Sequence, residues 1–203
     1  MEPSTIAEVI QALEDGSEPS EFLGYSARVE LVKVEARAQE DNQLLMGVTT
    51  REEGRLLSYY VCDSLFDVSQ WIRFGRVVQN SITLQELIIQ LRKTAQTDDE
   101  FITNAGQCLT AAFAEAKHNK SIVKADLNLT LGLSINDLSY FIQNNEALSY
   151  LKLEYWGKSM TLENSTDLSR AIGSVLLHKL DIKFCGFESA ESFEQFLGGV
   201  LQC

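Results

Sequence analysis

The sequence predicts an α/β protein, a short right-handed solenoid in which parallel strands alternate with helices. First, residues 177–187 fit the pattern L-x-x-L-x-L-x-x-N/C-x-L at every fixed position, with Ile182 and Phe187 in place of leucine. Second, the same apolar spacing recurs upstream. Third, a capping signal precedes the helical part of each unit. Because alternate residues of a strand point to opposite sides, Leu180 and Ile182 share the apolar side.

Residues 1–62 are predicted to form an N-terminal helix followed by strands. Thr5 and Glu8 have the spacing of a capping box, and apolar residues recur at helical spacing as far as Leu13. Three extended segments follow, at 27–38, 43–50 and 54–62, and polar loops separate them. This region is therefore either a strand-rich cap or a degenerate first repeat.

Residues 63–203 are predicted to form an array of about four strand–helix units, closed by a helix that begins near residue 190. Capping boxes precede four of the helices, at Ser64, Thr97, Ser134 and Asn164. The strand cores share three apolar positions each: Leu84/Leu87/Ile89, Ile122/Ala125/Leu127, Leu148/Leu151/Leu153 and Leu177/Leu180/Ile182. The first of these positions are 38, 26 and 29 residues apart. A compact α/β sandwich with parallel strands is the competing architecture, and the recurring apolar spacing favours the array.

These units resemble the leucine-rich repeats of the ribonuclease-inhibitor type, in which an α-helix backs each strand. The resemblance covers 64–203 and is strongest over 145–187. The ladder position that usually carries Asn or Cys carries Cys only at Cys185, since the other units place Arg92, Thr130 and Trp156 there. An insertion at 156–163 is expected to bulge out. The resemblance implies a horseshoe with parallel concave strands and convex helices, ligand binding on the concave face and no catalytic residue.

If the apolar positions point inward, the residues between them line the concave face. Lysines and carboxylates then face one another across neighbouring strands, and Tyr150 provides an aromatic anchor, which predicts a binding strip for a protein partner. The candidate partner-binding residues are Lys124, Asp126, Tyr150, Lys152, Glu154, Lys179, Asp181 and Lys183. The alternative interpretation is that these charges only satisfy one another on a solvated sheet face.

The composition argues against several classes of partner and location. The net charge of −12 opposes nucleic-acid phosphates and anionic lipid, so neither nucleic acid nor a membrane is predicted as a partner. The sequence has no apolar run long enough to span a membrane and no signal-peptide pattern at its N-terminus. The 4 cysteines lie far apart, which is typical of reduced thiols. These features predict an intracellular, cytoplasmic protein.

No known catalytic motif stands out in the sequence. It has no P-loop, dinucleotide glycine fingerprint, zinc-ligand spacing or nucleophile elbow, so we expect no enzyme, no cofactor and no metal site. The predicted function is a non-catalytic protein–protein interaction module. Two alternatives stay open: a regulator that inhibits or activates another enzyme, such as a GTPase, and a structural fragment that self-associates through a C-terminal end without a polar cap.

Overall fold

The computed structural model describes residues 5–14, 30–38, 43–52, 55–63, 68–91, 99–129, 135–155, 159–184 and 186–201. The elements in these ranges are α1 (Ile6–Glu14), β1 (Glu30–Ala38), β2 (Leu44–Glu52), β3 (Arg55–Asp63), α2 (Val68–Asn80), β4 (Glu86–Leu91), α3 (Asp99–Ala116), β5 (Lys124–Leu129), α4 (Ile135–Asn144), β6 (Tyr150–Tyr155), α5 (Leu162–Gly173), β7 (Lys179–Phe184) and α6 (Ala190–Val200). Each strand and helix predicted in the described ranges is present, which confirms the α/β class.

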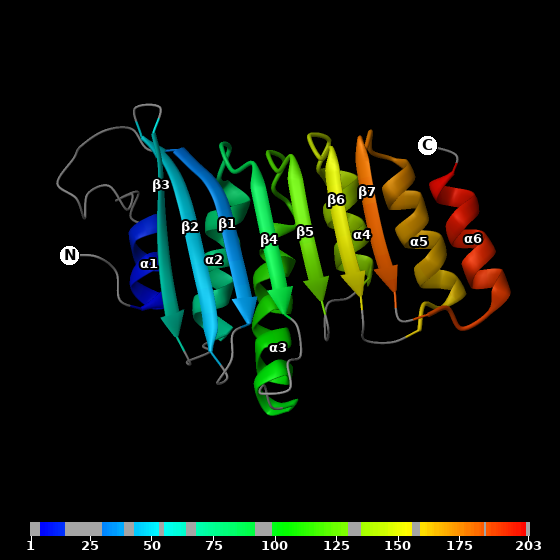
Figure 1. Cartoon of the computed structure of the whole chain (residues 1–203), viewed down its shortest axis with the longest axis horizontal. Helices are drawn as coiled ribbons and strands as arrows, with labels where there is room; N and C mark the ends of the chain where they lie inside the picture. The colour runs from blue at the N-terminus through cyan, green and yellow to red at the C-terminus, as the bar shows by residue number, and fades with distance from the viewer. Residues whose placement is uncertain are drawn as a thin grey trace.

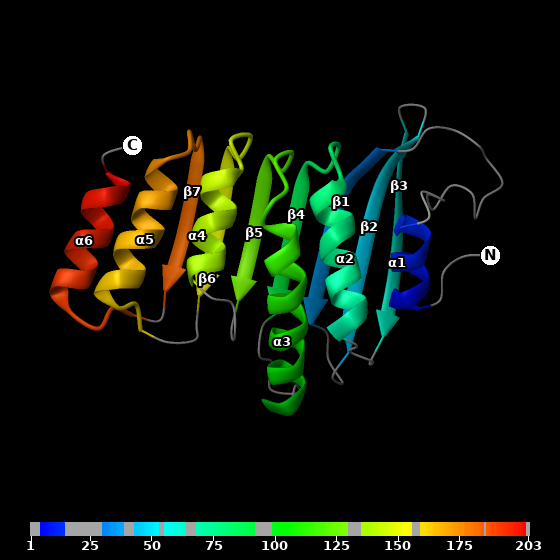
Figure 2. The ribbon, with the colours of Figure 1, turned by 180° about the vertical axis from the view of Figure 1, so that it is seen from behind.

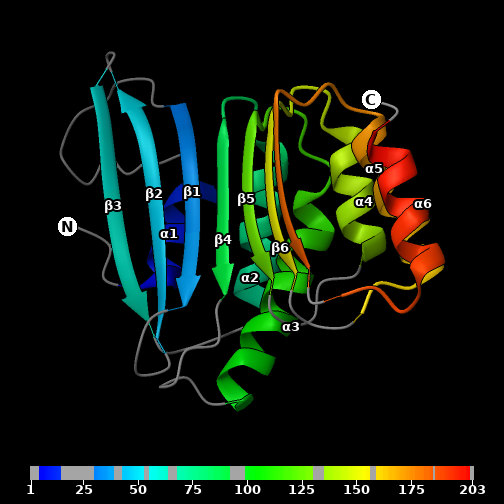
Figure 3. The ribbon, with the colours of Figure 1, turned by 45° about the vertical axis from the view of Figure 1, so that its right-hand side comes forward.

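The strands form one open sheet with the order β3-β2-β1-β4-β5-β6-β7. β1, β2 and β3 pair antiparallel, whereas β1, β4, β5, β6 and β7 pair parallel. The described helices form a layer on one face of the sheet and leave the other face uncovered (Figures 1 and 2), and the view in Figure 3 separates the two layers. Because β1 pairs with β4, the predicted boundary at residue 62 lies within one continuous sheet.

The predicted strand cores supply the interior of the molecule. The apolar positions of β4, β5 and β6 with their preceding turns are at most 5% exposed: Leu84, Leu87, Ile89, Ile122, Ala125, Leu127, Leu148, Leu151 and Leu153. The matching residues of β7 are only partly buried: Leu177, Leu180 and Ile182. The same spacing therefore gives full burial in the middle of the sheet and partial burial at its end.

Two of the predicted capping boxes lie in described residues and have different outcomes. The capping box of α1 is confirmed, because Thr5 N donates to Glu8 Oε2 and Glu8 N donates to Thr5 Oγ1, both at 3.2 Å. The predicted cap at Asn164 is wrong, because α5 begins at Leu162 and Thr161 Oγ1 accepts from Asn164 N. Threonine is also a preferred N-cap residue, so two capping signals lie within a few residues of one another, and the helix uses the first.

In the described part of the predicted insertion at 156–163, Met160 is packed into the core, whereas Ser159 and Leu162 are exposed. Met160 is fully buried and forms a parallel bridge with Phe187, and residues from Leu162 onward belong to α5. An apolar side chain next to the β6–β7 core gains more from burial than from exposure in a loop. Several residues singled out in the sequence lie outside the described residues: Ser64, Arg92, Thr97, Thr130, Ser134, Trp156 and Cys185.

A buried asparagine links neighbouring units where α3 turns into β5. Asn119 Nδ2 donates to Val78 O and Ser81 O at 2.7 Å, and its Oδ1 accepts from Ser121 N. Asn145 occupies the same place before β6 and is fully buried. Each asparagine lies three residues before the first apolar position of the following strand, Ile122 or Leu148. The several backbone partners of the buried Asn119 amide fix its turn, so β5 begins in register with β4.

Candidate binding face

Side chains that point away from the helices form three rows across the sheet, which we call the outer face. Strand register aligns the first row as Ser58, Thr49, Lys33, Glu86, Lys124, Tyr150 and Lys179. It aligns the second as Tyr60, Gly47, Glu35, Ile88, Asp126, Lys152 and Asp181. It aligns the third as Cys62, Leu45, Arg37, Gln90, Asn128, Glu154 and Lys183.

The candidate residues from the sequence all lie on β5, β6 and β7 in these rows. Tyr150 is the register partner of Lys124 on one side and of Lys179 on the other. Lys152 lies between Asp126 and Asp181 in the next row. Because parallel neighbours lie about 4.8 Å apart, side chains of opposite charge in one row meet directly.

Lys152 is the centre of the ion pairs on β5 and β6. Its Nζ lies 3.2 Å from Asp126 Oδ2 and 3.7 Å from Glu154 Oε1, and its side chain is 18% exposed. Burial alone would lower the pKa of Lys152, but the hydrogen bond and charge of Asp126 and the charge of Glu154 raise it above the ordinary value. Glu154 also pairs with Lys183 at 3.1 Å and accepts from Asn128 Nδ2 at 2.7 Å. Ion pairs and hydrogen bonds therefore connect the charged side chains of β5, β6 and β7 in this part of the outer face.

A second cluster, outside the residues predicted from the sequence to bind a partner, surrounds Glu35 on β1. Glu35 Oε2 lies 3.0 Å from Lys33 Nζ and 2.9 Å from Arg37 Nη2. Burial alone would raise the pKa of Glu35, but hydrogen bonds and charge from Lys33 and Arg37 bring it below the ordinary value. A Cβ atom on Gly47 would lie 2.7 Å from Glu35 Cγ, so the glycine leaves room for this carboxylate.

The two clusters are joined by a hydrogen-bonded glutamine. Arg37 Nη1 donates to Gln90 Oε1, and Gln90 Nε2 donates to Asp126 Oδ2, both at 3.2 Å. A continuous polar network thus runs from β1 to β7. The signal for the β1 part was present in the sequence, since Lys33, Glu35 and Arg37 alternate with apolar residues. Their position beside β4 was not predictable, because two antiparallel strands intervene in the chain.

The charges near β7 are less completely paired. The Tyr150 ring has Lys124 Nζ 5.8 Å and Lys179 Nζ 5.1 Å from its centroid, which is cation–π distance. Lys124 also pairs with Glu86 at 3.1 Å. Among the described residues, Lys179 pairs with no carboxylate, and the Asp181 side chain makes no hydrogen bond or ion pair. An aromatic ring beside unpaired opposite charges suits recognition of a polar partner surface.

Within the described ranges, no group of three His, Cys, Asp or Glu side chains is placed to hold a metal ion. Over the same ranges, no helix combines the length and apolar character that crossing a membrane requires.

Comparison with known proteins gives no family for the chain. No family model matches the sequence, and no curated protein matches it. Among solved structures, the chain is similar to "Leiomodin-1 Actin-Binding Site 2 (ABS2)", with 12% sequence identity and a TM-score of 0.45. That match covers 98% of this chain and 90% of the other. A likeness at this level does not indicate what the chain binds.

Proposed function

We propose that this protein is a non-catalytic interaction module that binds a protein partner on the outer face, centred on Tyr150, Lys179 and Asp181. The observation that carries the proposal is the contrast in pairing across that face. Lys152 pairs with Asp126 of the neighbouring strand, and Glu35 pairs with Lys33 and Arg37 of its own strand. In contrast, Lys179 and Asp181 have no charged partner among the described residues. A paired lattice provides a rigid platform, and the unpaired end provides groups that a ligand can satisfy.

The charge of the outer face supports the same proposal. It holds six cationic and five acidic side chains, so it is close to neutral, whereas the whole chain has a net charge of −12. The acidic excess therefore lies elsewhere on the molecule. A partner with mixed charges is repelled less by the outer face than by the remaining surface, which favours this face for docking.

We propose further that the units containing β4 to β7 are repeats of a leucine-rich solenoid of the ribonuclease-inhibitor type. Two features favour this: the same three apolar positions recur in each strand region, and buried asparagines lie at equivalent turns before β5 and β6. In such an array each unit packs mainly against its neighbours, and the strand face is the usual ligand surface.

The test is an affinity pull-down that compares the native chain with Tyr150→Ala/Lys179→Glu. Lys120→Glu is the matched control, because Lys120 is an exposed lysine outside the outer face. Circular dichroism and thermal unfolding first confirm that all three proteins are folded. We expect the native chain and the control to retain a partner that the double variant does not retain. In a subsequent titration, the double variant should bind that partner at least about tenfold more weakly than the native chain does. A partner retained equally by all three, or the absence of any partner, contradicts the proposal.

A further inference from the structure

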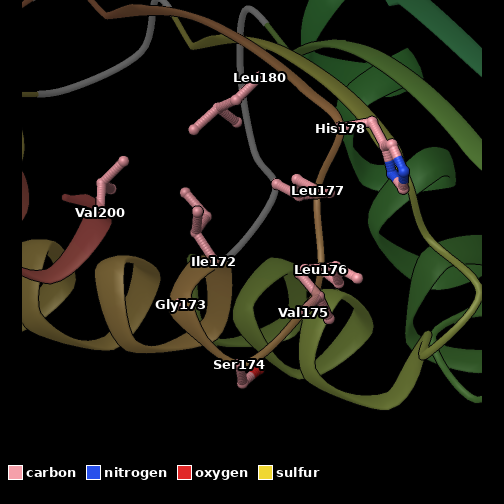
Figure 4. A pocket seen from close by; sticks show the side chains of 9 residues that line it. All are labelled: Ile172, Gly173, Ser174, Val175, Leu176, Leu177, His178, Leu180 and Val200. Carbon is pink, nitrogen blue, oxygen red and sulfur yellow. The ribbon is translucent and has the colours of Figure 1, made fainter. Parts of the chain in front are cut away.

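The last unit leaves an apolar groove between β7 and the final two helices. Figures 1 and 2 show α6 lying beyond β7, which is the last strand of the sheet. Two adjoining hollows of about 600 and 520 Å³ share Leu180 and Val200 and run along the helix side of β7. Figure 4 shows Ile172, Leu177, Leu180 and Val200 projecting into the first hollow, while His178 points away from it.

The groove occupies the place that a further strand would take. Leu151 and Leu153 of β6 are fully buried because β7 lies beside them, whereas Leu180 and Ile182 remain partly exposed. The far wall is also apolar, since Phe193 is 45% and Leu197 is 37% exposed. Exposed apolar positions on both walls favour an occupant that supplies apolar side chains.

The backbone of β7 is available on the same side. Lys179 N donates to Ser149 O, so the amides of alternate residues from Lys179 face β6. The N–H and C=O groups of Leu180 and Ile182 therefore face the open edge, where the sheet has no further described strand. Such a row of free donors and acceptors is a template for an added strand.

The charged side chains on the outer side of β7 determine which sequence an added strand would need in order to be complementary. The charges along β7 alternate as positive, negative and positive, at Lys179, Asp181 and Lys183. Their register partners on β6 are partly complementary: Tyr150, Lys152 and Glu154. A strand on the open edge would be complementary if it carried acidic, basic and acidic residues at alternate positions, with apolar residues between them. This order is symmetric, so it fits in either chain direction.

We propose that the β7 edge binds an extended segment of a partner protein with the order acidic–apolar–basic–apolar–acidic, which adds a strand to the sheet. The apolar side chains enter the groove beside Leu180, Ile182 and Leu197, and the charged ones meet Lys179, Asp181 and Lys183. The charged contacts use Lys179, Asp181 and Lys183 of the outer face, whereas the groove and the backbone edge of β7 do not belong to that face.

The probe is a fluorescein-labelled peptide, acetyl-Ser-Glu-Leu-Lys-Leu-Glu-Ser-amide, titrated with the full chain by fluorescence anisotropy. The control peptide reverses the charges to Lys-Leu-Glu-Leu-Lys and is expected to bind at least about tenfold more weakly. Lys179→Glu is expected to reduce this preference for the acidic-ended peptide. Equal binding of both peptides to the native chain overturns the proposal.

Backbone methylation tests strand addition directly. One peptide is N-methylated at both leucines and another at the charged residues. Addition of a strand requires that one methylated peptide loses binding and the other keeps it, because alternate amides face β7. Loss with the leucine set indicates an antiparallel strand, and loss with the charged set indicates a parallel one. Retention of binding by both peptides overturns the proposal.

Two further controls separate the groove from other surfaces. Leu197→Glu is expected to weaken the peptide at least about tenfold, while Gln195→Glu adds the same charge at an exposed position of α6 and leaves binding unchanged. Lys124→Ala changes the outer face on β5, two strands away from the open edge, and is expected to leave peptide binding largely intact. Analytical ultracentrifugation checks self-association, and a stable dimer that excess peptide does not dissociate would assign the edge to a second copy and overturn the proposal.

Discussion

β6 and β7 carry the same sequence pattern but have different environments. Leu151 and Leu180 are register partners at equivalent positions, yet Leu151 is fully buried and Leu180 is only partly buried. The outer face shows the same contrast, since Lys152 of β6 has two carboxylate partners and Asp181 has no described partner. Burial and pairing in this sheet are therefore set by the neighbouring strand as much as by a residue's own identity.

The largest expected difference comes from truncating the paired leucines. Leu151→Ala is expected to lower the free energy of unfolding by about 2–5 kcal/mol, because it leaves a cavity in a fully packed site. Leu180→Ala is expected to cost about 1 kcal/mol, because the groove beside it is already open to solvent. Urea unfolding of both variants measures the two values. Equal losses would show that the β7 edge is as well packed as the interior.

Two helical glycines provide a second comparison of interior and end. A Cβ atom on Gly75 of α2 would overlap Ala112 O of α3, whereas one on Gly198 of α6 would meet nothing within 4 Å. Gly75→Ala is expected to destabilise by about 1–3 kcal/mol through overpacking. Gly198→Ala is expected to stabilise by up to about 1 kcal/mol, because alanine favours the helix. Thermal and urea unfolding check both signs, and destabilisation by Gly198→Ala would indicate that α6 is closely packed on that side.

The smallest expected effect is the loss of stability at acidic pH that results from protonation of Glu35. The pKa of Glu35 is lower in the folded state, so its stabilising contribution is complete above the unfolded-state pKa of about 4.3 and is lost as pH falls through the folded-state value. The difference in unfolding free energy between the native chain and Glu35→Gln should therefore shrink below about pH 4.5. Urea unfolding between pH 7 and 3 measures it, with Asp181→Asn as a control for loss of one carboxylate from the outer face. A difference that does not change with pH contradicts the pairing of Glu35 with Lys33 and Arg37.

Much of the fold was predictable because the strands and helices carry local sequence signals, namely apolar spacing and capping residues. Apolar spacing located β4 to β7, and Thr5 with Glu8 marked the start of α1. Because alternation fixes which side of a strand each residue faces, the candidates from Lys124 to Lys183 could be placed on one surface. Their function as a partner-binding site stays a prediction.

Features that depend on long-range pairing were not predictable. Nothing local to β1 indicates that it lies beside β4, so the cluster around Glu35 was missed. The start of α5 was misplaced because two capping signals lie within a few residues of one another, and no local pattern shows which of them caps the helix. The openness of the β7 edge likewise depends on what neighbours the strand, which no local pattern records.

The strand order also bears on how the chain is made. From β4 onward, each strand pairs with one that leaves the ribosome before it, and β2, the antiparallel partner of β1, also precedes β4 in the chain. The sheet can therefore grow during synthesis by addition at a single margin, without waiting for a later segment. At each stage the nascent chain exposes a template for its next strand, as the β7 edge does in this structure. Slow translation would lengthen the exposure of that margin to other extended chains in the cell.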